Sequence, residues 1–357
     1  AAPVGAVYTN NLPGAQITRG STSVRDGWEK LRKAGAQARS MLVQAAAAQW
    51  GVGADTLKVD SGAVVNGRKR LTFGELAEAA AKLPVPTEVT LKPAKEFTLV
   101  GKPAKRLDTA SKLDGTAIYG IDVKLPGMLH GAFAQCPTLG GTLAGFDAVQ
   151  AKTMPGVKDV VGTDNGVVVI ADHYWQAYKA LGAVKIKWDA GANASLDNDA
   201  IRARLRKAAT RNGRSVRNDG NAAAALKGAA KVVRATYELP MLAHATLEPQ
   251  CCTADVRADS ADVYAPTQTQ TIAQATAAAV VGLKPEQVKI HTTLLGGGFG
   301  RRLEVDFIGA AMVASKAVGK PVKVIWSREQ DVTHDTYRPP AFEIGRASCR
   351  ERVLRLV

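Results

Sequence analysis

The chain has 357 residues, of which 46% are hydrophobic and 22% charged. This composition excludes an intrinsically disordered chain, and the length exceeds the usual size of one hydrophobic core, so we expect two or three domains. The formal net charge of +15 comes from Lys and Arg spread along the chain without a nucleic-acid-binding motif. We therefore expect no nucleic-acid partner.

The four cysteines, Cys136, Cys251, Cys252 and Cys349, show no C-x-x-C spacing. The sequence therefore contains no recognisable iron–sulfur or zinc framework. We interpret the adjacent Cys251 and Cys252 as two buried apolar side chains, because a disulfide between neighbours is strained. No run of about twenty apolar residues is present, so we expect no transmembrane segment.

The first part of the chain predicts a long helix and a strand. Apolar residues recur at three- and four-residue spacing over 22–50, which predicts a helix with one buried stripe that includes Val24 and Leu31. Residues 57–66 alternate like a single strand that enters a turn at Asn66.

A second helix and a linker follow. Thr72 and Glu75 predict a capping box for a helix that ends before Pro84. Residues 85–95 contain several prolines and are interpreted as a linker.

From Gly101 the pattern changes to short strands around one helix, which predicts a module of mixed α and β structure. The expected elements are strands Ile118–Val123, Leu129–Ala134, Val157–Val161, Val167–Ile170 and Val184–Trp188, and a helix near Ala171–Leu181. Residues 193–221 are polar and basic and predict one helix over Asp197–Ala209.

A third unit is expected from about Ala229. Its expected elements are strands Val232–Glu238, Cys252–Val256, Ala261–Tyr264, Val288–Leu295 and Val322–Trp326, and helices over 271–281 and 303–318. Gly319, followed by Pro321, is a stop signal for the last helix.

The stretch HTTLLGGGFGRRLEVD (291–306) is the strongest functional motif. Glycine lacks a Cβ, so the backbone at 296–298 can approach a bulky ligand, while Arg301 and Arg302 add positive charge near a helix N-terminus, as in an anion site. A dinucleotide fingerprint G-x-G-x-x-G fits poorly, because Arg301 stands where the third glycine is required. We interpret the motif as a ligand-cradling loop, with a purely structural turn as the alternative.

Three further patterns have both a structural and a functional interpretation. Gln268 in APTQTQ follows a strand end and is either a donor to an oxo group or an ordinary exposed amide. His244 and Glu248 in HATLEP have the spacing of a metal pair, but without a third ligand we favour a satisfied, partly buried histidine. Ser21 and Thr22 in GSTSVR suit either helix caps or a phosphate site.

Taken in order, the motifs resemble one family. The segments GSTSVR, DGTAIYGIDVKLPGML, LAHATLEP, APTQ, GGGFGRRLEVDF and KPVKVIWSREQDVTHDTYRP are similar to the molybdenum hydroxylases of the xanthine dehydrogenase family. Within it they most resemble the large, molybdopterin-binding subunit of the isoquinoline 1-oxidoreductase and membrane-bound aldehyde dehydrogenase branch. The resemblance covers nearly all of 5–342.

The resemblance implies an α+β fold. An α/β hammerhead domain over 101–190 would be flanked by partial molybdopterin-binding domains over 1–95 and 229–342, with a polar connecting segment over 191–228. Residues 343–357 resemble a translated sequencing adapter, so we expect them to be a non-native tail.

The implied cofactor is molybdopterin cytosine dinucleotide carrying molybdenum. Gln268 matches the glutamine that hydrogen-bonds an oxo group of the metal. The loop around the metal and the pterin is matched by Gly297, Gly298, Phe299, Gly300 and Arg301. A second cofactor-facing loop is matched by Gly20, Ser21, Thr22 and Ser23. Phe299 would also form a wall of the substrate pocket.

The implied reaction is hydroxylation, with oxygen from water, of an N-heteroaromatic such as isoquinoline or nicotinate, with an aldehyde as the alternative substrate. Leu303 stands where purine-oxidising members have a substrate-binding glutamate, which argues against purines, and Glu304 is expected to cap the following helix. The catalytic glutamate belongs to a C-terminal stretch outside this sequence. We therefore expect no catalytic residue and no metal ligand here, and an inactive polypeptide.

Electrons would pass to 2Fe–2S clusters in a separate small iron–sulfur subunit, because this chain has no cysteine pattern for them. A cytochrome c subunit is a further candidate partner. We expect a periplasmic or membrane-associated location in a bacterium, with the signal outside this sequence. A NAD-type dehydrogenase and a basic noncatalytic binding module are the rival interpretations.

Overall fold

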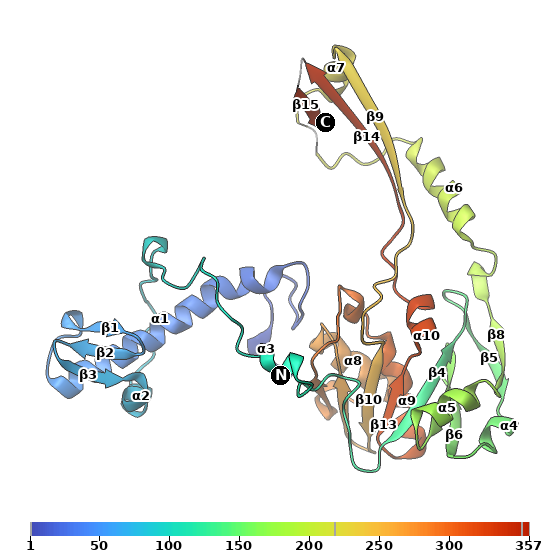
Figure 1. Ribbon diagram of the computed structural model, residues 1–357, viewed down its shortest axis with the longest axis horizontal. Coiled ribbons are helices and arrows are strands. Elements are labelled where there is room, and N and C mark those ends of the chain that lie inside the picture. The colour runs from blue at the N-terminus through green and yellow to red at the C-terminus, as the bar shows by residue number, and fades with distance from the viewer. Residues whose placement is uncertain (1, 218, 351–352, 357) are drawn as a thin grey trace. The chain divides into compact units, whose positions relative to one another are not determined.

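The structure is a computed structural model that describes residues 2–217, 219–350 and 353–356. The chain forms two compact units (Figure 1). The smaller is Thr9–Ala117, and the larger combines Ala1–Tyr8 with Ile118–Val357.

The smaller unit contains three helices and a short antiparallel sheet. Its helices are α1 (Thr22–Trp50), α2 (Phe73–Ala81) and α3 (Thr109–Leu113), and its strands, in sheet order, are β1 (Lys58–Asp60), β2 (Ala63–Asn66) and β3 (Lys69–Thr72). The buried core consists of Ala45, Ala46, Ala47, Leu57, Val64, Leu76 and Ala80.

The predicted long helix is confirmed as α1, which ends at Gly51 in a left-handed conformation with φ of 63°. The predicted buried stripe is wrong in its first half, because Val24 and Leu31 are 78% and 75% exposed. Only the last turns of α1, around Ala46, join the core with β2 and α2.

The single strand predicted over 57–66 is wrong. It is two strands, β1 and β2, joined by a turn in which Ser61 and Gly62 have φ of 45° and 77°. The predicted capping box of α2 is confirmed. The Glu75 N–H donates to Thr72 Oγ1 (3.3 Å), and the Thr72 N–H donates to Glu75 Oε2 (2.7 Å).

The larger unit is built on a mixed seven-stranded sheet. In sheet order its strands are β12 (Val288–Thr292), β11 (Ala261–Ala265), β10 (Cys251–Val256), β13 (Val322–Ile325), β4 (Leu129–Gln135), β7 (Gly166–Ala171) and β6 (Val157–Gly162). The pairs β11–β12 and β13–β4 are parallel, and the other pairs are antiparallel.

Helices and two small sheets complete this unit. The helices are α4 (Val149–Lys152), α5 (Tyr174–Leu181), α6 (Asn198–Ala209), α7 (Ala222–Lys227), α8 (Gln270–Val281), α9 (Asp306–Val318) and α10 (Arg328–Thr333). The small sheets are β5 (Thr142–Asp147) with β8 (Lys185–Asp189), and β15 (Val353–Leu356), β14 (Ala341–Arg350) and β9 (Lys231–Leu239) in that order. The sequence reasoning missed β5 and α4.

Strand β7 is buried on both faces, which explains its unbroken apolar sequence. Val168 and Ile170 belong to the core under α8 and α9, whereas Val167 and Val169 pack on the other side with α5. The main core also contains Cys252, and both Cys251 and Cys252 are buried and free of disulfides, as expected. Burial raises the pKa of both thiols.

The strand predicted over Ile118–Val123 is wrong, because residues 120–122 form a turn and Tyr119 makes an isolated parallel bridge to Leu294. Its backbone is hydrogen-bonded to side chains distant in the sequence. The Ile121 N–H donates to Glu248, and the Ile121 carbonyl accepts from Lys323 Nζ (2.6 Å). Gly120 packs so closely that a Cβ there would lie 2.7 Å from Pro266.

The segments expected as a hammerhead domain and as a molybdopterin-binding domain share one sheet, since β4, β6 and β7 continue the sheet of β10–β13. The boundary between them stays a prediction. The expected non-native tail also stays a prediction: part of it lies in β14 and β15, and residues 351, 352 and 357 are outside the described residues.

Candidate functional site

Two loops of the larger unit lie side by side. One is the glycine loop after β12, and the other is the HATLEP segment before β10. The Glu248 N–H donates to the Gly296 carbonyl (3.0 Å), and the Gly296 N–H donates to Glu248 Oε2 (2.9 Å). A Cβ at Gly296 would lie 2.3 Å from the Cβ of Glu248, so only glycine fits there. The glycine loop is therefore hydrogen-bonded to the HATLEP segment and packed closely against it.

Left-handed backbone is concentrated in this pair of loops. Gly297, Phe299 and Gly300 have φ of 101°, 54° and 108°, and Ala245 on the facing loop has φ of 47°. For the two residues with a Cβ this conformation costs about 1–3 kcal/mol each, and such strain clusters at functional sites. Phe299 is also 66% exposed, so burial of its ring does not offset the strain.

The structure brings Gln268 to the glycine loop. Gln268 follows β11, its N–H donates to the Arg302 carbonyl (3.0 Å), and its Oε1 accepts from the Gly300 N–H (3.2 Å). A Cβ at Gly298 would lie 2.8 Å from the same Oε1. Gln268 and 297–300 thus form one cluster, and their roles at a cofactor stay predictions.

The interpretation of Arg301 and Arg302 as anion-binding charges is wrong for their side chains. Both are buried, at 1% and 0% exposure, and each has an acidic partner within the protein. Arg301 makes a two-pronged bond to Asp306 (2.9 Å for each prong), with Asp335 Oδ1 2.9 Å from its Nε. Arg302 pairs with Glu248 (2.9 Å).

Burial opposes the charge of both guanidinium groups. Burial lowers the pKa of Arg302. At Arg301 burial is again the largest influence, but the hydrogen bond that Arg301 donates to Asp306 and the nearby carboxylate charges together outweigh it and raise the pKa of that group. A contact between Arg301 and a cofactor would have to come from its backbone, and that role stays a prediction.

The metal-pair alternative for His244 and Glu248 is not supported. His244 Nδ1 lies 3.0 Å from both carboxylate oxygens of Asp335, and the His244 N–H donates to the same carboxylate. The preferred interpretation of a satisfied, partly buried histidine is confirmed. Across the residues that the structure describes, no group of three or more His, Cys, Asp or Glu side chains could hold a metal ion.

Sequence reasoning missed both the Arg302–Glu248 and the Arg301–Asp335 pairs. The partners are 54 and 34 positions apart, and no periodic pattern links them. The only available signal was two adjacent arginines before an apolar helix, a place where unpaired charges are not expected to be buried.

The expectation that Glu304 caps the following helix is wrong. A short 3₁₀ turn, Arg301–Leu303, intervenes, and α9 begins at Asp306 with Val305 at its N-cap. The acidic residue in the first turn of α9 is therefore Asp306, which also pairs with Arg301.

Gly20–Ser23 belong to the smaller unit, where α1 begins. Ser21 is at the N-cap with φ of 54° and makes no capping hydrogen bond through its side chain. The Thr22 hydroxyl donates to the Arg19 carbonyl (2.8 Å) and accepts from Asn10 Nδ2 (2.7 Å). Ser21 is thus not a side-chain cap, and a cofactor-facing role for Gly20–Ser23 stays a prediction.

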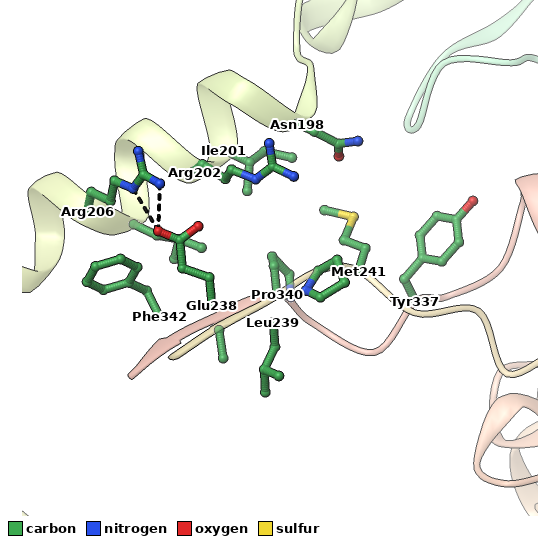
Figure 2. A pocket seen from close by; sticks show the side chains of 13 residues that line it. Asn198, Ile201, Arg202, Arg206, Glu238, Leu239, Met241, Tyr337, Pro340 and Phe342 are labelled. Atoms are coloured by element: carbon green, nitrogen blue, oxygen red, sulfur yellow. Dashed lines mark hydrogen bonds and ion pairs between the residues drawn. The ribbon is translucent and has the colours of Figure 1, made fainter. Parts of the chain in front are cut away.

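A pocket of about 550 Å³ lies elsewhere in the larger unit, between α6 and the paired strands β9 and β14 (Figure 2). Its basic side chains are already paired: Arg206 Nε with Glu238 (2.8 Å) and Arg202 with Asp199 (3.0 Å). None of the predicted cofactor residues lines it. We therefore place the candidate site at the glycine loop.

Among the described helices, none is both long and apolar enough to cross a membrane.

The sequence matches one family model and is similar to several curated oxidoreductases. Residues 206–350 match the family model described as a molybdopterin cofactor-binding domain. The chain is 32% identical to isoquinoline 1-oxidoreductase subunit beta of Brevundimonas diminuta, over 93% of this chain and 48% of that protein. It is 34% identical to membrane-bound aldehyde dehydrogenase (pyrroloquinoline-quinone) of Gluconacetobacter polyoxogenes, over 94% of this chain and 46% of that protein.

The fold is similar to that of solved molybdenum hydroxylases. Aldehyde oxidoreductase from Desulfovibrio gigas superposes with a TM-score of 0.56 at 19% identity, over 78% of this chain and 36% of that one. The predicted α+β class is confirmed. The chain spans about half the length of the curated relatives it matches. It belongs to the molybdopterin-binding subunits of the xanthine dehydrogenase family.

Proposed function

We propose that this chain is part of a molybdenum hydroxylase that oxidises an N-heteroaromatic such as isoquinoline or nicotinate, with oxygen from water. The observation that carries the proposal is the Gln268 side chain held against the strained loop 297–300, in a chain of this family. The likeness to a relative named for isoquinoline supports the substrate class.

The residues of the cluster fit a cofactor that approaches the backbone closely. Gly298 leaves open the space that a Cβ would fill beside Gln268. Because Gln268 Oε1 accepts from the Gly300 N–H, the group of this side chain that would donate to an oxo group is its amide NH₂. When bound, a molybdopterin would supply the redox-active metal that oxidises the substrate carbon.

The chain's own residues would orient the reactants and exclude water. Gln268 would fix the cofactor's orientation through its amide donors, and Phe299 would present its exposed ring to a planar substrate. We assign proton abstraction to a glutamate outside this sequence.

Aldehyde oxidation is the second candidate function, favoured by the 34% identity to a protein named an aldehyde dehydrogenase. A flat heteroaromatic and an aldehyde would differ in how they pack against the Phe299 ring. Assays of the full-length enzyme with isoquinoline, nicotinate and an aromatic aldehyde separate the two by their kcat/KM ratios.

We further propose molybdopterin cytosine dinucleotide as the form of the cofactor. A small iron–sulfur subunit would receive the electrons, and a cytochrome c subunit is a candidate beyond it. The name of the relative as a subunit supports a multi-subunit enzyme. A periplasmic or membrane-associated location is proposed by likeness to a relative named membrane-bound.

The test is chemical analysis of the full-length enzyme, coexpressed with its partner subunits and maturation factors. We expect stoichiometric molybdenum, and cytidine monophosphate after acid hydrolysis. Active preparations without molybdenum would exclude this function. Activity that requires NAD would favour a dehydrogenase instead, and retention on DNA at physiological salt would favour the basic binding module.

A further inference from the structure

Arg302 is fully buried and reaches three segments that meet at the candidate site. Its Nε donates to the carbonyl of Gly297 (2.9 Å), and its Nη2 donates to the carbonyl of Glu248 (2.8 Å). Its Nη1 lies 3.4 Å from the carbonyl of Pro266, two residues before Gln268. One rigid guanidinium therefore touches the glycine loop, the HATLEP loop and the segment that carries Gln268.

Glu248 is the acidic partner that keeps this charge in place. It is 7% exposed, and its Oε2 both pairs with Arg302 Nη2 (2.9 Å) and accepts from the Gly296 N–H (2.9 Å). Its Oε1 accepts from the Ile121 N–H (2.9 Å). The carboxylate is thus bonded on both oxygens, and loss of either partner leaves the other charge buried without compensation.

The main chain of Arg302 also contacts the segment that carries Gln268. Its carbonyl accepts from the Gln268 N–H (3.0 Å) and lies 3.3 Å from the Thr267 hydroxyl. Gln268 and Gly297 are therefore both bonded directly to Arg302, one through the main chain and one through the side chain.

The loop needs such an external support. Three of its four residues 297–300 are left-handed, and the exposed ring of Phe299 cannot anchor it by burial. Arg338 also contacts this loop, at the Phe299 carbonyl (3.2 Å), but Arg338 is exposed. Arg302, in contrast, contacts the loop through a fully buried side chain.

We propose that Arg302, paired with Glu248, is a positioning residue that sets the separation between Gln268 and the loop 297–299. The inference rests on the proposed function, in which Gln268 and the loop 297–299 hold the cofactor between them. Arg302 touches neither cofactor nor substrate and acts through Gly297 and Gln268.

The test uses four variants of the full-length enzyme: Arg302→Met, Arg302→Lys, Glu248→Gln with Arg302→Met, and Arg257→Lys as the control. Arg257 pairs with Asp255 and Asp262 and donates to Ser260, all within the β10–β11 hairpin, and none of these contacts reaches residues 296–302. The measurements are melting temperature, hydrogen exchange of the amides in 297–300, molybdenum content, kcat and KM.

We expect Arg302→Met to lower the melting temperature, speed exchange in the loop and lower kcat on the order of 10²-fold, because catalysis is sensitive to about 1 Å of misplacement. Arg302→Lys should recover part of kcat through the restored charge pair, and Arg257→Lys should retain wild-type kcat. The double variant removes both charges, so its melting temperature should recover. Its loop exchange should stay fast and its kcat low.

A merely structural role predicts that kcat recovers with the melting temperature in the double variant, and that result would overturn the inference. Unchanged loop exchange in Arg302→Met would overturn it as well. These outcomes are distinct from failure of the proposed function, which would show as absence of molybdenum from the wild-type enzyme.

Discussion

Gln268 illustrates how a neutral side chain is oriented without charge. Its main-chain N–H and its Oε1 are both bonded to the glycine-loop segment, to Arg302 and Gly300 respectively. The bond from the Gly300 N–H assigns the side-chain oxygen of Gln268 to the loop.

From this geometry we expect Gln268→Ala to reduce turnover far more than stability. Removing a preorganised donor at a reaction centre costs on the order of 10²–10³-fold in kcat. The variant loses the hydrogen bond from the Gly300 N–H and buries no unpaired charge, so the melting temperature should fall by only about 2–4 °C. The measurements are kcat and thermal unfolding of the full-length enzyme.

Gln274→Ala is the control, because the Gln274 side chain on α8 likewise bonds to a main-chain group, the Val288 carbonyl (2.9 Å). It should lose similar stability and keep its turnover. Equal turnover in the two variants would show that Gln268 does not lie at the metal.

At the scale of the element, α2 depends on its capping box. Glu75 accepts from both the hydroxyl and the N–H of Thr72 (2.7 Å each), and these bonds hold its pKa below the ordinary value of 4.5. A lowered pKa means that the stabilisation is present above pH 4.5. It is lost as the pH falls through the folded-state pKa, which lies below 4.5.

We expect amide protection in α2 to decrease on acidification below pH 4.5, when measured by native-state hydrogen exchange. Thr72→Ala should remove about 1 kcal/mol of protection at pH 7 and flatten the decrease. Ser21→Ala serves as the control, because Ser21 makes no capping bond to α1. A wild-type pH dependence in Thr72→Ala would refute this account.

At the scale of the molecule, β4 joins the two parts of the seven-stranded sheet. It pairs with β13 on one side and β7 on the other, so it links strands from both halves of the larger unit. Gly131 on β4 packs closely against both neighbouring strands. A Cβ there would lie 2.8 Å from Val324 and 3.0 Å from Val168.

Gly131→Ala should therefore destabilise the larger unit by about 1–3 kcal/mol, through overpacking of a core without free space. Hydrogen exchange of the β7 amides measures this change. Gly145→Ala on β5 is the control, because a Cβ at Gly145 meets no atom within 4 Å. Equal protection of β7 in the two variants would contradict the account of β4 as a tightly packed join.

Sequence by itself determined the features that depend on neighbours along the chain. The extent of α1, the box at Thr72 and Glu75, the stop of α9 at Gly319 and the buried run of β7 all follow from local periodicity, capping and backbone freedom. The motif order also determined the family, since a resemblance of that length does not depend on knowing the contacts.

Only the tertiary structure decided how charges and strands are shared between distant segments. It turned Arg301 and Arg302 inward to carboxylates, bent the expected strand 118–123 into a turn whose backbone bonds to side chains, and placed strands from two expected domains in one sheet. A buried charge must find its partner wherever the fold brings one, and strand order depends on which edges meet. Neither is encoded in spacing along the chain, so the sequence could place the site but not show what holds it in shape.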